Sequence, residues 1–182
     1  MKRKTTKNKQ TKQKKPFPVR LLLCILLGVA IAANMTLIFC FSTEDREDSG
    51  NRSQGVTETI VEIIVKDYET MTPPEQEEVI EKYHPPIRKL AHFCEFGLLG
   101  VLTTAFMHAL GKGKKWLWWV IPAGFCLLYA ISDEVHQIFT QRGPAALDVL
   151  IDFSGSLTGI VGMNLILLLV FHLIRKRKEK RL

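Results

Sequence analysis

Four long apolar stretches follow one another along the sequence. The first, residues 21–41, contains no charged side chain. At about 1.5 Å per helical residue it is long enough to cross a hydrocarbon layer of about 30 Å. Three more stretches cover residues 88–110, 116–139 and 147–174, and in the last two the acidic residues gather near one end. This pattern predicts an all-α integral membrane protein built as a four-helix transmembrane bundle.

Basic residues flank these stretches at three places. Residues 1–20 hold nine lysines and arginines and no acid, residues 111–115 hold three lysines, and residues 175–182 hold six basic residues against one acid. Basic flanks of membrane helices lie preferentially on the cytoplasmic side. We therefore expect residues 1–20 and 175–182 to be basic cytoplasmic tails.

The segment between the first two spans, residues 42–87, is then a long outer loop. It carries twelve acidic and four basic residues, the opposite balance to the tails. Within it, Thr57 or Thr59 is expected to cap one short helix, and Thr72 another. The His-Pro-Pro sequence at residues 84–86 predicts an extended segment just before the second span.

The charge and the cysteines narrow the function classes. The net charge of +7 is the sum of basic ends and an acidic loop, which argues against nucleic acid as a partner and favours anionic membrane lipids. A cleaved secretory signal is an alternative for the N-terminus, but residues 34–41 stay apolar beyond the small residues 30–32, which favours an uncleaved anchor. The cysteines lie in predicted spans without C-x-x-C spacing, as expected of apolar fillers.

Several ionisable side chains lie within three of the predicted spans, where each costs a few kcal/mol. Arg88, His92 and Glu95 are spaced four and three residues apart and so share one helical face. Counted from the outer ends of their spans, Glu95, Asp133 and Asp152 all lie on the order of 8 Å below the outer interface. We expect the three helices to present polar groups to one layer.

If these faces turn inward, polar side chains surround a cavity that is open to the outside. Its expected members are Arg88, His92, Glu95, Asp133, Glu134, Gln137, Arg142, Asp148 and Asp152. The alternatives are that Arg88 and Lys89 anchor the helix at the interface, and that Asp148 stabilises a helix start. Anchoring explains Glu95 and Asp133 poorly, because short side chains at that depth do not reach the interface.

The segments that carry these residues resemble the VanZ-like family, named for a protein of low-level teicoplanin resistance. They read RKLAHFCEFGLLG, SDEVHQIFTQR and DVLIDFSGSLTG. The resemblance covers residues 41–162 and implies a multi-pass protein of the bacterial cytoplasmic membrane. The family's motif positions fall on Arg88, Lys89, His92, Glu95, Phe96, Asp133, Glu134, Gln137, Arg142, Asp148 and Gly155. Two departures are Glu44, where many members have glutamine, and Asp152, where an amide is common.

Two classes of function fit these residues. In the first, the protein is an envelope enzyme that acts on a lipid-linked compound and affects glycopeptide (teicoplanin) susceptibility, with a histidine and carboxyl groups as acid/base pair and arginines holding phosphate or carboxylate. The expected acid/base residues are His92, Glu95, Asp133 and Glu134, and the expected substrate-binding residues are Arg88, Gln137, Arg142, Asp148 and Asp152. In the second class, the cavity only binds or transports a lipid, wall precursor or lipoglycopeptide.

A divalent cation is a variant of either class. His92, Glu95, Asp133 and Asp152 offer the donor atoms that such ions accept. We do not favour it at the sequence level, because the set is rich in oxygen and the arginines compete for the same acids. No metal site and no cofactor is assigned from the sequence.

Overall fold

The computed structural model describes residues 19–43, 46–111, 113–139 and 146–180, and within these residues it contains helices and no strand. The predicted all-α class is confirmed. The elements are α1 (Val19–Thr43), α2 (Arg46–Ile64), the short 3₁₀ helix η1 (Tyr68–Thr70), α3 (Pro73–Leu110), α4 (Leu117–Phe139) and α5 (Ala146–Glu179).

Three segments are long and apolar enough to cross a membrane, namely Val19–Ser42, Pro73–Leu110 and Leu147–Glu179. The helix α4 packs against α1, α3 and α5 and has nearly the bounds of the expected third span. It is not among these three segments, because Asp133 and Glu134 lie in its last two turns. A membrane protein is thus supported by three helices, and the fourth span stays a prediction.

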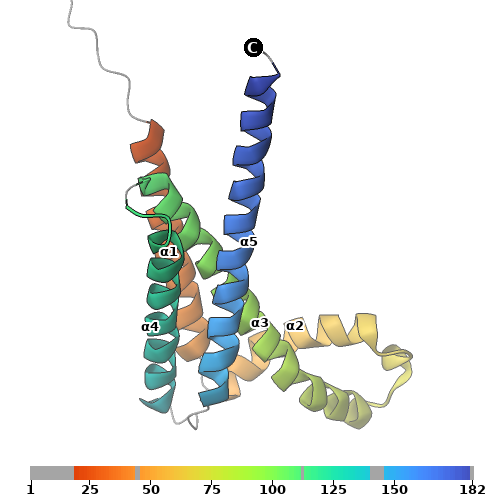
Figure 1. Ribbon diagram of the computed structural model, residues 1–182. Coiled ribbons are helices and arrows are strands. Elements are labelled where there is room, and N and C mark those ends of the chain that lie inside the picture. The colour runs from red at the N-terminus through yellow and green to blue at the C-terminus, as the bar shows by residue number, and fades with distance from the viewer. Residues whose placement is uncertain (1–18, 44–45, 112, 140–145, 181–182) are drawn as a thin grey trace, which may run out of the picture.

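The helices α1, α3, α4 and α5 form the main bundle, while α2 lies to one side of it (Figure 1). Side chains from three of these helices meet in a buried apolar cluster: Ile38, Phe96, Leu99, Cys126 and Ala130. Most other large apolar side chains of α1 and α5 are exposed, as helices surrounded by hydrocarbon require. Cys126 fills the core as expected, and the described cysteines are all free.

The most extensive packing joins α3 and α5, and glycines make it possible. A Cβ atom added at Gly155 would clash with the backbone carbonyl of Phe93, and one added at Gly159 would clash with that of Gly97. Small residues allow helix backbones in membranes to approach this closely. Gly155 and Gly159 of α5 thus pack within one chain, whereas nothing lies within 4 Å of a Cβ added at Gly162.

The prediction of an extended segment at residues 84–86 is wrong, because α3 runs through these residues without a break. Proline removes the hydrogen bond to the carbonyl four residues earlier. For Pro85 and Pro86 these carbonyls belong to Glu81 and Lys82, whose exposed positions let water take the place of the lost donors. The charged first part of α3 therefore continues directly into its apolar part.

The start of α3 confirms the predicted cap, whereas the start of α2 does not. The Glu75 carboxylate accepts hydrogen bonds from the backbone N–H of Thr72, at 2.8 Å, and from its hydroxyl, at 2.7 Å. Neither Thr57 nor Thr59 begins α2, which already starts at Arg46. The Thr59 hydroxyl donates to the carbonyl of Gly55 at 2.9 Å, a bond that threonine makes inside a helix.

Two polar contacts hold α1 near its two ends. At the start, Arg20 donates from Nε to the carbonyl of Ala109 at 2.6 Å and from its guanidinium to that of Leu110. These carbonyls end α3 and lack a partner within the helix. At the other end, the Ser42 hydroxyl donates to Asp133 of α4. The second contact belongs to the polar layer in which the expected site lies.

Candidate functional site

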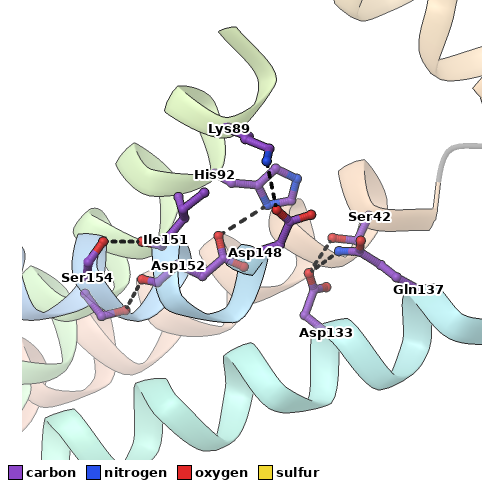
Figure 2. Close-up of polar contacts among 10 residues, drawn as sticks. Ser42, Lys89, His92, Asp133, Gln137, Asp148, Ile151, Asp152 and Ser154 are labelled. Carbon is purple, nitrogen blue, oxygen red and sulfur yellow. Dashed lines mark hydrogen bonds and ion pairs between the residues drawn. The ribbon is translucent and has the colours of Figure 1, made fainter. Parts of the chain in front are cut away.

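Polar side chains from α1, α3, α4 and α5 meet in one layer of the bundle, as Figure 2 shows. Asp133 and Asp152 are each 4% exposed and Gln137 is 7% exposed, although all three are polar. The His92 side chain from α3 is also largely buried, at 13% exposed. The predicted convergence of three spans on one polar layer therefore agrees with the arrangement of these side chains.

Asp133 is held firmly by one of its two carboxylate oxygens. Its Oδ2 accepts a hydrogen bond from the Ser42 hydroxyl at 2.8 Å and another from the Gln137 side-chain amide at 2.9 Å (Figure 2). Its Oδ1 is buried and accepts no hydrogen bond from the described residues. Leaving a buried charged oxygen without a donor costs free energy. A hydrogen-bond donor or a cation placed at Oδ1 would remove this free-energy cost and so bind favourably there.

His92 and Asp152 face each other where α3 crosses α5. The His92 Nδ1 atom lies 3.9 Å from Asp152 Oδ1, which is longer than a hydrogen bond. One donor atom each from His92, Asp133 and Asp152 lies within 4.8 Å of the other two. The glycine contact described above sets this spacing, because Gly155 follows Asp152 by three residues and Phe93 follows His92 directly.

Asp148 lies one turn closer to the start of α5 and has a different partner. Its carboxylate is 3.4 Å from the Lys89 ammonium group, and both side chains are partly exposed. Lys89, for which anchoring at the interface was an alternative, thus pairs with an acid at the rim of the polar layer. Although Asp148 and Asp152 are four residues apart, Asp152 alone belongs to the cluster with His92 and Asp133.

Two of the remaining predicted residues, Glu95 and Glu134, lie near Asp152 of this cluster. Arg88, Glu95 and Glu134 are half-buried. Asp152 is close enough to Asp133, Asp148, Glu134 and Glu95 for mutual electrostatic repulsion between their carboxylates. Arg142 lies outside the described residues. The layer therefore combines five interacting carboxyl groups with His92 and, at its rim, Lys89.

Sequence reasoning missed two serines in the layer. The buried Ser42 contacts Asp133, and the buried Ser156 donates to the backbone carbonyl of Asp152 at 3.1 Å. Ser42 directly follows the first apolar stretch and was therefore assigned to the outer loop, so its position in the sequence did not identify it. His136 of α4 packs against the Phe39 ring of α1 with centroids 4.6 Å apart.

Comparison with known proteins adds the family. No curated protein and no solved structure matches the chain. A family model described as VanZ/LLP1 matches residues 23–171, a range that includes every residue of the polar layer and all but the ends of the bundle. The match agrees with the resemblance of the three polar segments. The chain therefore belongs to the VanZ/LLP1 family.

Proposed function

We propose that the protein crosses the bacterial cytoplasmic membrane four times, with α4 as the third span and both termini in the cytoplasm. In this orientation the polar layer lies toward the outer face and forms a pocket that opens outward. The pocket binds the head group of a lipid-linked envelope compound, such as a wall precursor or a lipoglycopeptide, and acts on it. Glycopeptide (teicoplanin) susceptibility changes as a result.

One observation carries the proposal, which is the burial of Asp133 and Asp152 beside His92 among membrane helices. The three side chains come from three different helices and approach within 4.8 Å. Ionisable groups at such positions are expensive, and they typically mark substrate or ion pathways in membrane proteins. Packing alone would be served better by apolar side chains, as in the Ile38 and Phe96 cluster nearby.

The chemistry proposed for the pocket divides its residues into two groups. A histidine next to buried carboxyl groups can transfer protons near neutral pH, and the acid/base residues are His92, Glu95, Asp133 and Glu134. Guanidinium groups pair with both oxygens of a phosphate or carboxylate, and the other polar side chains bind the head group. The proposed binding residues are Arg88, Gln137, Arg142, Asp148 and Asp152.

Mass spectrometry of membrane lipids and lipid-linked wall precursors tests the proposal. Cells that carry an empty vector are compared with cells that produce the wild type or Glu95→Gln, which keeps the size of the side chain and removes its charge. Glu78→Gln, an exposed position in the outer part of α3, is the matched control. We expect one lipid species to appear or vanish with the wild type and Glu78→Gln, and to stay unchanged with Glu95→Gln.

The outcomes separate the two classes of function. A wild-type lipid profile with Glu95→Gln, at equal protein abundance, would rule out its role in acid/base chemistry. If no lipid changes while the wild type still alters teicoplanin susceptibility, the pocket binds or transports its ligand without chemistry. If neither lipids nor susceptibility change, the proposed function is wrong.

A further inference from the structure

We propose that His92, Asp133 and Asp152 together bind one divalent transition-metal ion, Zn²⁺ or Mn²⁺, between α3, α4 and α5. Their donor atoms lie within 4.8 Å of one another, and the one separation between His92 Nδ1 and Asp152 Oδ1 is 3.9 Å. Donor atoms about 2.1 Å from a tetrahedral ion are about 3.4 Å apart. Small side-chain rotations are therefore enough to close the site around an ion.

The orientation of Asp133 points to a ligand independently of the cluster. Its side chain is 4% exposed, and its buried Oδ1 has no hydrogen-bond donor among the described residues. Its Oδ2 is held by Ser42 and Gln137 (Figure 2). Carboxylates that bind metals are commonly fixed in this way: one oxygen binds the ion, and neighbouring side chains donate hydrogen bonds to the other.

The charge balance of the layer also favours a cation. Within the described residues, no lysine or arginine lies within 4.0 Å of the Asp133 or Asp152 carboxylates, since Lys89 pairs with Asp148 instead. Arg88, one of the two arginines that the sequence suggested as competitors, therefore forms no ion pair with these two acids, and Arg142, the other, lies outside the described residues. Carboxylates that repel each other in a low-dielectric layer gain more from a divalent ion than from separate monovalent partners.

The donor set selects the kind of ion. An imidazole nitrogen suits Zn²⁺ and other late transition metals, whereas carboxylate oxygens suit Mn²⁺, Mg²⁺ and Ca²⁺. One nitrogen with two carboxylates therefore favours Zn²⁺ or Mn²⁺ over Mg²⁺. Three protein ligands leave at least one coordination position for an oxygen of another molecule.

The use of the ion rests on the proposed function, although its binding does not. An open coordination position next to the outer face takes an oxygen of a phosphate or carboxylate in the lipid head group. With His92 and Asp133 engaged as ligands, the half-buried Glu95 and Glu134 are the carboxyl groups left to move protons. Binding of the ion and turnover of the lipid can therefore be measured separately.

The test is a metal titration of the full-length protein in detergent, purified with a tag that lacks histidine and stripped with EDTA. Cys40→Ser and Cys94→Ser remove the exposed thiols to which Zn²⁺ would otherwise bind. Isothermal titration with Zn²⁺, Mn²⁺ and Mg²⁺ measures affinity, and elemental analysis after dialysis measures the number of ions per chain. We expect one Zn²⁺ or Mn²⁺ per chain and binding of Mg²⁺ at least about tenfold weaker.

Two isosteric variants and one control make the result specific. Asp133→Asn and Asp152→Asn each lower the affinity at least about tenfold, while Glu78→Gln, which removes the same charge from an exposed position, binds as the wild type does. The proposal is overturned if the wild type shows no saturable binding of either ion, or if all three variants bind equally well. The wild-type titration needs no variant, so a folding defect in Asp133→Asn cannot hide the absence of metal binding. An ion site without any change in lipids or in teicoplanin susceptibility would contradict the proposed function and leave the proposed metal site unaffected.

Discussion

At the scale of single residues, the two oxygens of Asp133 have opposite situations. Oδ2 has two donors, from Ser42 and Gln137, while the buried Oδ1 has none among the described residues. A hydrogen bond to a charged acceptor contributes about 1.5 to 3 kcal/mol. Ser42 and Gln137 therefore fix the direction in which the remaining oxygen points, which makes them positioning residues for the cluster.

We expect Ser42→Ala to lower the free energy of unfolding by about 1.5 to 3 kcal/mol, because the Asp133 carboxylate loses a donor where water does not replace it. We also expect Ser42→Ala to lower the affinity for Zn²⁺ or Mn²⁺, because Asp133 is then oriented less firmly. Ser42→Thr keeps the hydroxyl and should keep this affinity. Thermal unfolding in detergent and the metal titration measure the two effects. Equal unfolding temperatures for wild type and Ser42→Ala would show that this contact contributes nothing.

At the scale of helices, the close contact of α3 with α5 sets the distance between His92 and Asp152. The backbone at Gly155 lies against that of Phe93, so even one methyl group would push the helices apart. Overpacking of this kind typically costs about 1 to 3 kcal/mol. Separation of the helices would also widen the 3.9 Å gap between the two side chains.

Gly155→Ala should therefore lower the thermal stability, whereas Gly162→Ala in the same helix should not. No atom lies within 4 Å of a Cβ at Gly162, and alanine favours a helix over glycine by about 1 kcal/mol. Unfolding of both variants in detergent, followed by tryptophan fluorescence, makes the comparison. A Gly155→Ala protein as stable as Gly162→Ala would mean that the two helices pack less tightly than described.

The helix bounds show where sequence reasoning succeeds and where it fails. The apolar stretches 21–41 and 116–139 correspond closely to α1 and α4, because the change from apolar to charged residues marks the ends of a membrane helix. The start of α3 was misplaced because the rule for proline is local. It does not take into account that Glu81 and Lys82, whose carbonyls lose a donor, are exposed residues.

The site shows a similar division. Residue counts along the helices placed Glu95, Asp133 and Asp152 in one layer, whereas the cluster contains His92 instead of Glu95. Helical spacing also could not separate Asp148 from Asp152, which share a face only approximately. Four residues advance a helix roughly 40° beyond a full turn, and this rotation directs Asp148 to Lys89 instead. The contact of Ser42 with Asp133 spans 91 residues, so only the packing of the helices reveals it.

At the scale of the whole molecule, the charge distribution predicts which parts face the cytoplasm. The last turn of α5 is basic, with Lys176, Arg177 and Lys178, and the link between α3 and α4 carries lysines as well. The outer part of α3 begins with Glu75 and further acids. This asymmetry favours the proposed orientation, with α2 and the start of α3 outside.

Labelling with a maleimide that does not cross membranes tests the orientation in intact cells. In a background without native cysteines, Glu75→Cys should react at once, because its exposed position lies outside. Lys114→Cys, also exposed but between α3 and α4, should react only after lysis. The reverse labelling pattern would show that the protein has the opposite orientation, with the polar layer on the cytoplasmic side.

The two contacts that hold α1 have a consequence for the order of assembly. Arg20 binds carbonyls 89 and 90 residues later in the chain, and Ser42 binds Asp133, 91 residues later. A chain that enters the membrane from its N-terminus cannot make the first contact before α3 is in place, nor the second before α4 follows. The helix that is synthesised first is therefore fixed at both ends only by segments that are synthesised much later, and a ribosome-bound chain that stops before Asp133 would lack the Ser42 contact.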